Sequence, residues 1–445
     1  MAIKEKKPWN RTPLIESSVL SESAGWYGCT ISPPPPPSPC CLITTAHETR
    51  LLNRRSRVFL KLETLQPGGS FKSRGIANFC LRALNRSQHP SKLHFYSSSG
   101  GNAGIAAVHA AIFLGRPCTV VVPMSTSDVM VAKIKAAGAQ EVVQFGCGLK
   151  EAGEYLREVV MKKAEERGEE GVHVMPYDHQ DIWDGNATMI EEIREQMIEI
   201  GEDAPNVVAC SVGGGGMING ILQAIEGIEA EGSSGWDRTE VVALETLGAD
   251  SLAQSLQQGE HITLPGITSQ ATTLGAVRVS ERTYELASKH QASGRVKSAV
   301  FTDAEAAMGS WRLADDERIM VELACGVTAA LCYGGRLKRA LGRPVKPDDK
   351  VVLIICGGHG VTLGMIDKWK REFGDVDADM KATEHPEAVT SEVTAHMDSK
   401  VDVQVDVVET ELTPPPTPPD TGIFTQMTHD HLENVARAMC RPIIC

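Results

Sequence analysis

The chain has 445 residues, of which 57 are acidic and 44 basic, so its formal net charge is −13 at neutral pH. This charge argues against binding to nucleic acid or to an anionic membrane surface, because both are themselves negative. No apolar stretch reaches membrane-spanning length, the N-terminus lacks a signal-peptide core, and the twelve cysteines are irregularly spaced. We therefore expect an α/β protein with free thiols in the cytoplasm.

The first unusual segment covers residues 26–56 and contains five consecutive prolines, Pro33 to Pro37. Such a run adopts the polyproline II conformation and cannot lie inside a compact α/β core. One interpretation is a Pro-rich surface loop that binds a partner domain. The other, which we favour, is a translated intron left in the gene model, and sequencing of the mature transcript would decide between them.

Lys72 follows a glycine-softened turn, Gly68-Gly69-Ser70-Phe71, and precedes a predicted helix over Ile76 to Leu84. If the lysine is desolvated there, its pKa falls and its amine becomes nucleophilic at neutral pH, as a Schiff-base lysine requires. A solvated loop lysine is the ordinary alternative, because most lysines are exposed. The motifs that follow favour the first interpretation.

Two glycine-rich loops lie downstream, and each precedes a predicted helix. Ser97 to Gly104 leads into Ile105 to Leu114, and Gly213 to Gly216 separates the apolar run Val207 to Val212 from a helix that begins near Met217. Unpaired backbone N–H groups at such helix starts favour an anion, which predicts a carboxylate site at the first loop and a phosphate site at the second. A merely flexible turn is the alternative for the tetraglycine.

Between residues 93 and 355, predicted strands and helices alternate, which indicates parallel sheets covered by helices on both faces. The predicted strands are Leu93–Tyr96, Cys118–Val122, Glu141–Gln144, Val207–Ser211, Val241–Leu244 and Val351–Ile355. The predicted helices are Ala106–Leu114, Ser127–Ala137, Leu149–Arg167, Ala187–Ile200 and Gly326–Leu341. We interpret the acidic run Asp315 to Arg318 as a helix start, where the dipole favours acids, and Glu191 to Glu195 as a solvated helix face.

The last predicted strand runs into the turn Cys356-Gly357-Gly358-His359-Gly360. This position places Cys356 at the carboxyl end of a strand, where open α/β sheets bind ligands, although a strand-end cysteine is usually a small buried hydrophobe. Residues 374–445 are acidic and polar and include Pro414 to Pro419, so we expect a disordered tail apart from a short helix near His431 to Met439.

Several of these segments, in this order, resemble the fold-type II pyridoxal-phosphate enzymes, and among them the catabolic L-serine/L-threonine dehydratases. The resemblance runs over about residues 8–25 and 57–373, and relatives pass almost directly from the first range to the second, so the insert interrupts the family pattern. The segments that carry it are Ser70–Gly75, Ser98–Gly104, Gly213–Gly216, Leu244–Ala249, Asp315–Arg318, Val321–Gly326 and Cys356–Gly358.

The resemblance implies a two-domain α/β fold with pyridoxal 5'-phosphate between the domains. A large domain would comprise residues 1–25, 57–66 and 178–373, and a small domain residues 67–177. Closure of the domains over the substrate would follow, and a homodimer is the family expectation.

The resemblance also implies roles for individual residues. Lys72 would form the Schiff base with the cofactor and remove the substrate α-proton, and Ser99 would lie near the opposite face of the ring. Phe71 would pack beside the ring, Asn102 would hydrogen-bond the phenolic oxygen, and Cys356 would face the pyridine nitrogen. The phosphate would be held by Gly213, Gly214, Gly215, Gly216 and Met217, and the substrate by Ser98, Ser99, Gly100 and Asn102.

The implied reaction is β-elimination from L-serine to pyruvate and ammonia, and from L-threonine to 2-oxobutanoate. A thiol at position 356 is a weaker partner for the ring nitrogen than a carboxylate, which suits elimination more than transamination. A monovalent cation such as K⁺ is implied at the Glu245 carboxylate and the backbone oxygens of Ala249, Leu274 and Ala276. Glu245 as an ordinary salt-bridged residue is the alternative.

Two other functions stay open. A serine racemase of the same fold needs an acid–base group on each face of the cofactor, and Ser99 is a candidate for the second, but such relatives usually carry serine at position 356. A catalytically inactive interaction protein that uses the proline-rich segments is disfavoured by the intact Lys72, Asn102 and tetraglycine. His359 stands where relatives usually carry serine or asparagine, and we expect it to be solvated.

Overall fold

The computed structural model describes residues 7–25 and 56–376. The proline-rich insert apart from Ser56, and the tail beyond residue 376, lie outside the described residues, and the expectations about both stay predictions. No helix in the described part of the chain is long and apolar enough to cross a membrane.

The larger of two β-sheets has six strands in the order β1-β2-β10-β7-β8-β9, all parallel except β1. Its strands are β1 (Leu14–Ser17), β2 (Arg57–Leu62), β7 (Val207–Ser211), β8 (Glu240–Thr246), β9 (Val296–Phe301) and β10 (Lys350–Ile355). The central strands β7 and β10 are apolar along almost their whole length, as expected for strands buried on both faces.

The smaller sheet has four parallel strands in the order β5-β4-β3-β6. They are β3 (Leu93–Ser97), β4 (Cys118–Val122), β5 (Glu141–Gln144) and β6 (Glu170–His173). A second apolar cluster, distinct from the one around the larger sheet, includes Phe95, Val120 and Ile105. The two sheets fall on the two sides of the predicted domain division, whose boundaries stay a prediction.

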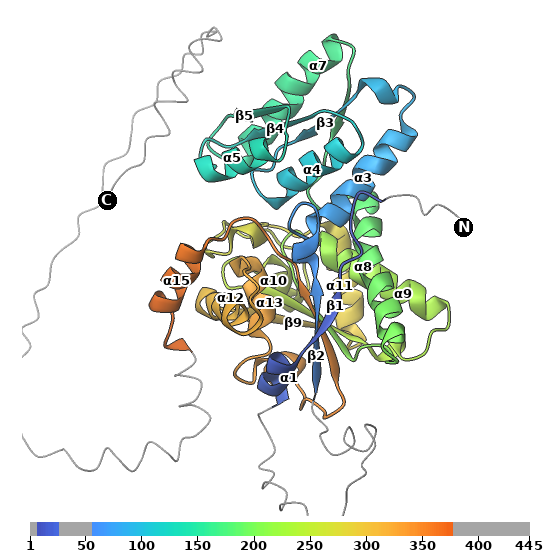
Figure 1. Ribbon diagram of the computed structural model, residues 1–445, viewed down its shortest axis with the longest axis vertical. Coiled ribbons are helices and arrows are strands. Elements are labelled where there is room, and N and C mark those ends of the chain that lie inside the picture. The colour runs from blue at the N-terminus through green and yellow to red at the C-terminus, as the bar shows by residue number, and fades with distance from the viewer. Residues whose placement is uncertain (1–6, 26–55, 377–445) are drawn as a thin grey trace, which may run out of the picture. The chain divides into compact units, whose positions relative to one another are not determined.

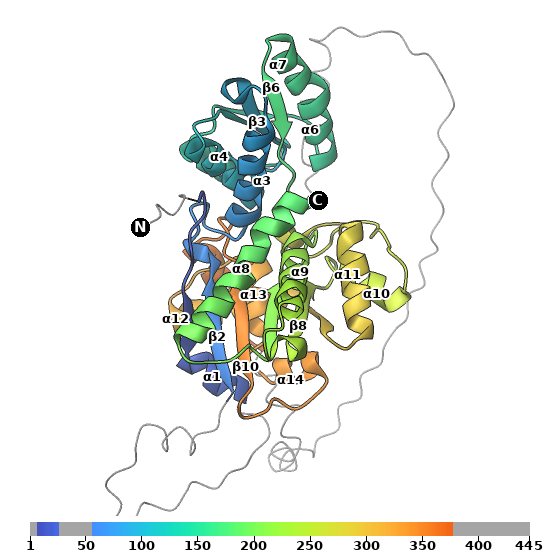
Figure 2. The ribbon, with the colours of Figure 1, turned by 90° about the vertical axis from the view of Figure 1, so that its right-hand side faces the viewer.

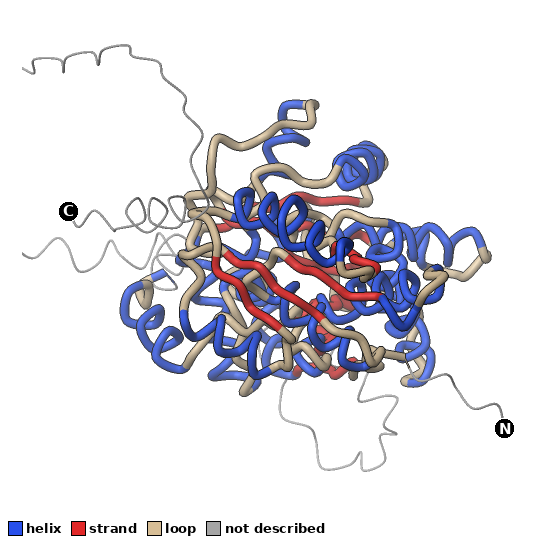
Figure 3. Tube along the Cα trace, turned by 90° about the horizontal axis from the view of Figure 1, so that it is seen from above, coloured by secondary structure: helices blue, strands red, loops and turns tan. Residues whose placement is uncertain are grey.

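Helices surround both sheets, which confirms the predicted fold class (Figures 1 and 3). They are α1 (Ser18–Gly25), α3 (Lys72–Arg86), α4 (Asn102–Phe113), α5 (Asp128–Ala136), α6 (Leu149–Tyr155), α7 (Lys162–Glu166), α8 (Gln180–Glu199), α9 (Gly216–Ala230), α10 (Ser251–Gln258), α11 (Glu281–Ala292), α12 (Asp303–Glu317), α13 (Leu323–Ala330), α14 (Arg336–Leu341) and α15 (Leu363–Glu372). Figure 2 shows α8 and α9 side by side over one face of the six-stranded sheet, while α13 contacts β7, β8 and β10.

The interpretation of Asp315 to Arg318 as a helix start is wrong. Asp315 to Glu317 end α12, and Arg318 closes that helix in a left-handed conformation with φ of +64°. The start of α12 is instead the capping box of Thr302 and Glu305. Acids at a helix end oppose its dipole, and here ionic or hydrogen-bonded partners compensate, such as Lys370 at 2.6 Å from Asp315.

Other helix predictions also need correction. The single helix predicted over Leu149–Arg167 contains a π-helical segment, Leu156–Met161, and the one over Gly326–Leu341 is two helices, α13 and α14. The predicted helix from Ala187 begins earlier, at Gln180.

A buried ionic network joins the N-terminal segment to β2, α3 and α8, and it corrects the interpretation of Glu192 as solvated. The fully buried Arg74 guanidinium contacts Glu63 at 2.7 Å and Glu192 at 2.7 Å. Lys61, also fully buried, contacts Glu192 at 2.7 Å and the Thr12 carbonyl at 2.7 Å. The network therefore balances two cations with two carboxylates. It holds the first turn of α3, because Arg74 lies two residues after Lys72, where that helix begins.

Candidate active site

Lys72 is the first residue of α3, and the residues just before it are held by a segment remote in the chain. The loop before it pairs with the loop after β10: Phe71 N donates to Cys356 O at 3.0 Å, and Gly358 N donates to Gly69 O at 3.0 Å. These bonds bring Phe71, Lys72 and Cys356 together, as the sequence analysis expected of one site.

The Lys72 side chain is partly buried and lies among Pro176, Tyr177 and Phe71. Its Nζ donates to Pro176 O at 2.7 Å and lies 5.1 Å from the centre of the Phe71 ring and 5.8 Å from that of Tyr177. Burial lowers the pKa of the Lys72 ammonium to about 8, and the nearby Cys356 opposes the shift. The lysine is therefore a neutral amine far more often than an exposed lysine at the same pH, as a Schiff-base lysine requires.

The tetraglycine loop leads into α9, where no side chain fits. A Cβ on Gly214 would lie 2.5 Å from the Tyr177 ring, and one on Gly215, whose φ is +93°, would lie 1.9 Å from Thr283 Oγ1. Among the described residues, the backbone N–H groups of Gly213 through Met217 donate to no acceptor. A row of unpaired donors at a helix start fits a phosphate group.

The loop over residues 98–101 leads into α4 in the same way. Ser99 Oγ accepts from Gly101 N at 3.3 Å, and a Cβ on Gly104 would lie 2.0 Å from Ser99 O, so the helix packs directly on the loop. Asn102 begins α4 and reaches the other sheet, where its Oδ1 accepts from His359 N at 2.9 Å. His359 is not simply solvated as expected, because its Nε2 is buried and has no hydrogen-bond partner among the described residues.

Cys356 is 5% exposed, and its Sγ lies 3.7 Å from Ser211 Oγ. The hydrogen bond with Cys325, together with burial, raises the pKa of the Cys356 thiol well above its usual value. At neutral pH this group is a neutral thiol, so a carboxylate-like partner for a ring nitrogen is absent at this position.

Glu245, at the end of β8, is fully buried, which does not match the alternative of an ordinary salt-bridged residue. Its carboxylate accepts from Leu252 N at 2.9 Å and Ala253 N at 2.7 Å. Burial raises its pKa to about 8, although these hydrogen bonds oppose the shift. Leu274, one of the predicted cation ligands, contacts the tetraglycine, since a Cβ on Gly213 would lie 3.2 Å from Leu274 O.

Two residues of the site escaped the sequence analysis. Tyr177 covers the tetraglycine, and Glu322 contacts Asn102. The signal for Glu322 was present, because it is the acidic residue of an otherwise apolar run, Val321 to Cys325. Tyr177 left no comparable signal, since an aromatic residue after a strand has many ordinary roles.

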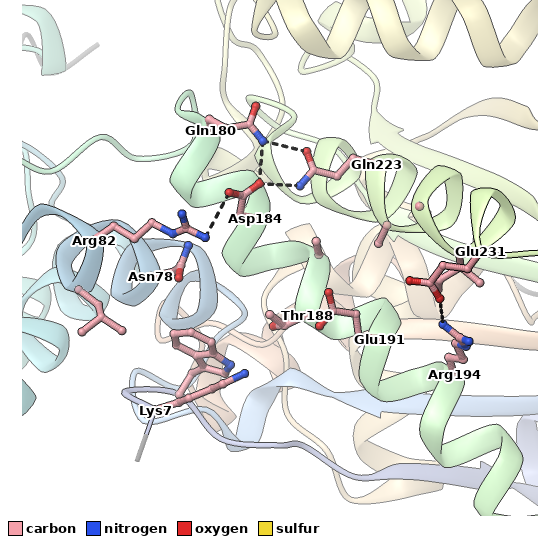
Figure 4. A pocket seen from close by; sticks show the side chains of 16 residues that line it. Lys7, Asn78, Arg82, Gln180, Asp184, Thr188, Glu191, Arg194, Gln223 and Glu231 are labelled. Atoms are coloured by element: carbon pink, nitrogen blue, oxygen red, sulfur yellow. Dashed lines mark hydrogen bonds and ion pairs between the residues drawn. The ribbon is translucent and has the colours of Figure 1, made fainter. Parts of the chain in front are cut away.

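A separate cleft of about 740 Å³ lies along α3, α8 and α9, and it contains none of the expected site residues (Figure 4). Its polar side chains pair mostly with one another, as in Arg82 with Asp184 and Arg194 with Glu231.

Comparison with known proteins agrees with this geometry. The family model described as "Pyridoxal-phosphate dependent enzyme" matches residues 37–357. An L-serine dehydratase of Saccharomyces cerevisiae (strain AWRI1631) is 41% identical over 310 residues, which cover 68% of this chain and 88% of the relative. A serine dehydratase-like protein of Rattus norvegicus is 36% identical over 370 residues, or 82% of this chain and 96% of the relative.

Among solved structures, a fungal L-serine ammonia-lyase from Rhizomucor miehei matches with a TM-score of 0.66 and 26% identity, over 83% of this chain and all of that one. Maize serine racemase matches with a TM-score of 0.60 and 22% identity, over 83% of this chain and 94% of that one, which shows the fold alone. Because the family model matches residues 37–357, which is more than half of the chain, this chain belongs to the family of pyridoxal-phosphate dependent enzymes.

Proposed function

We propose that the protein is an L-serine ammonia-lyase, which converts L-serine to pyruvate and ammonia and L-threonine to 2-oxobutanoate and ammonia. The observation that carries the proposal is the position of Lys72. Its amine, with a pKa lowered to about 8, lies 5.8 Å from the ring of Tyr177, and that tyrosine covers the donor-rich tetraglycine loop. The chain is also 41% identical to a yeast L-serine dehydratase.

The side chains and loops present fit pyridoxal 5'-phosphate. Gly213 to Met217 would hold its phosphate through backbone N–H groups, and Phe71, Asn102 and Cys356 would contact its ring. When bound, the cofactor supplies an electron sink that stabilises negative charge at the substrate Cα.

The residues of the chain would then bind the substrate and move its protons. Ser98, Ser99 and the N–H of Gly100 would hold the substrate carboxylate, since the loop presents hydroxyl and backbone donors at the start of α4. Lys72 Nζ, neutral in part at pH 7 to 8, would take the α-proton. The β-hydroxyl would leave with the electron pair of the Cβ–O bond and take up a proton to form water. The neutral Cys356 thiol would favour this path, because it offers a ring nitrogen no carboxylate partner.

We also propose a monovalent cation, such as K⁺, at the Glu245 carboxylate and the backbone oxygens of Ala249, Leu274 and Ala276. The support is a fully buried carboxylate without an ion-pair partner among the described residues. Oxygen ligands of this kind suit a hard cation. A cytoplasmic homodimer, whose small and large domains close over the substrate, completes the proposal.

The test is an absorbance spectrum of the purified protein followed by addition of L-serine in a coupled pyruvate assay. A visible cofactor band that changes on addition, with pyruvate formed, is the expected result. A band with D-serine formed and no pyruvate would assign the racemase activity instead. A protein without any band, even after incubation with pyridoxal 5'-phosphate, would contradict the proposal.

A further inference from the structure

Glu322 is a buried carboxylate at the N-cap of α13, where it meets donors from three other segments. Asn102 Nδ2, from α4, lies 3.2 and 3.1 Å from its two oxygens. Thr273 Oγ1, from the loop after α10, donates at 2.9 Å, and Gly360 N, from the loop after β10, donates at 2.5 Å. One carboxylate thus links the four-stranded half of the enzyme to two loops that carry expected site residues.

The surroundings of Glu322 are built to hold an anion without a cation. The residue is 5% exposed, and no lysine, arginine or histidine forms an ion pair with it among the residues that the structure describes. A Cβ on Gly358 would lie 2.2 Å from Glu322 Cδ, so the glycine there leaves space for the carboxylate. A buried anion is stable in such a place only when several donors solvate it, as the three donors do here.

The Glu322 carboxylate also determines the orientation of the Asn102 side-chain amide. A carboxylate only accepts hydrogen bonds and a backbone N–H only donates, so the Asn102 NH₂ must face Glu322 while Oδ1 faces His359 N. If one N–H is shared between the two Glu322 oxygens, which lie 3.2 and 3.1 Å from Nδ2, the second N–H is left for another acceptor. Asn102 is the residue expected to donate to the phenolic oxygen of the cofactor, and this orientation makes it a donor.

We propose that Glu322 is a positioning residue, which holds the Asn102 amide with its NH₂ group available to the cofactor while linking the two halves of the site. This inference rests on the proposed function for the role of Asn102. Glutamine at position 322 would offer a single acceptor oxygen to the three donors Asn102 Nδ2, Thr273 Oγ1 and Gly360 N. Its own NH₂ group would then face one of these donors. The Asn102 amide is then free to turn, and the cofactor loses its donor.

The experiment is a double-mutant cycle on cofactor binding with Glu322→Gln, Asn102→Ala and the combined variant. The readouts are the Kd of pyridoxal 5'-phosphate, measured by titration, and the pH at which the absorbance band of the bound cofactor changes. Each single variant should weaken binding about tenfold and move that pH in the same direction, while the combined variant should do little more than either alone. Thr273→Val, which removes a single donor, should give a smaller shift of the same sign.

Two control variants separate positioning from stability. Glu191→Gln, on α8 and away from the site, should leave both readouts unchanged. Arg74→Met should lower the melting temperature without moving the pH of the band. Additive effects in the cycle, or unchanged binding in Glu322→Gln, would overturn the inference.

None of these readouts requires turnover of the substrate. A protein that binds the cofactor but forms no pyruvate would therefore refute the proposed function. The double-mutant cycle on cofactor binding would still test the role of Glu322. If Glu322→Gln fails to fold, the pair Thr273→Val and Asn102→Ala gives the same cycle with a gentler change.

Discussion

Two buried carboxylates in this enzyme are held in opposite ways. Glu63, fully buried, contacts the Arg74 guanidinium with both oxygens, at 2.7 and 2.8 Å. Glu322, almost as buried, has only neutral donors. The ion pair of Glu63 with Arg74 cancels charge and joins elements of the fold. Glu322 keeps a net negative charge, which orients the amide, hydroxyl and backbone groups around it. Charge balance therefore distinguishes the ionic network around Arg74, which holds the fold, from the candidate active site.

The largest expected effect is a loss of activity on substitution in the candidate active site. Lys72→Ala removes the group that we propose takes the α-proton, so we expect pyruvate formation to fall by at least about 10⁴-fold. The melting temperature should not fall, because the ionic network around Arg74 stays intact. Steady-state kinetics and thermal melting of the same samples measure both. A variant that keeps a tenth of the activity would show that Lys72 is not the base.

In the ionic network around Arg74, substitution should instead lower the free energy of unfolding. Arg74→Met leaves Glu63 and Glu192 buried without their shared cation, which should cost about 3–5 kcal/mol of stability. Arg82→Met, whose side chain is 51% exposed and pairs with Asp184 at 3.6 Å, is the matched control and should cost less than about 1 kcal/mol. Chemical denaturation compares the two. Equal losses would refute the distinction between buried network and surface pair.

The pH dependence of stability tests the environment of Lys72 directly. In the cofactor-free protein its ammonium loses a proton at about pH 8, whereas an unfolded chain keeps the proton up to about pH 10.5. The unfolded state thus binds more protons in this window, and the lysine's contribution to stability rises with pH between about 8 and 10.5. The difference in melting temperature between wild type and Lys72→Met should show this rise, since the other lysines cancel. If the difference in melting temperature does not change with pH, Lys72 is exposed to solvent.

The smallest effect should come from the cation. If the proposed cation is bound, replacing K⁺ by tetramethylammonium should lower the melting temperature of the wild type by about 2–4 °C, because a ligand bound only to the native state is lost. Glu245→Gln should be insensitive to the exchange. The same dependence in both proteins would mean that Glu245 does not hold the ion.

Much of the fold was predictable because its signals are local. Buried parallel strands such as Val207–Ser211 appear as apolar runs, and the tetraglycine marks a helix start by itself. Glu322 was not assigned a role, because its partners Asn102 and Gly360 lie 220 and 38 residues away in the chain. The acidic run at Asp315 was misread because acids usually begin helices, and the partners that let them end one, such as Lys370, are remote.

The place of β2 in the larger sheet has a consequence for synthesis of the enzyme. Within residues 7–25 and 56–376, β2 pairs only with the short edge strand β1 and with β10, so about 290 residues must follow β2 before β10 exists. The strands β3 to β6, by contrast, find their partners within 93–173, and we expect this sheet to form on the ribosome first. Lys72 is thus synthesised well before Cys356 and Gly358, and the loop that precedes it forms its hydrogen bonds with them only after they have been synthesised. A nascent chain that stalls before Cys356 is synthesised would carry the folded four-stranded sheet but would lack a complete active site.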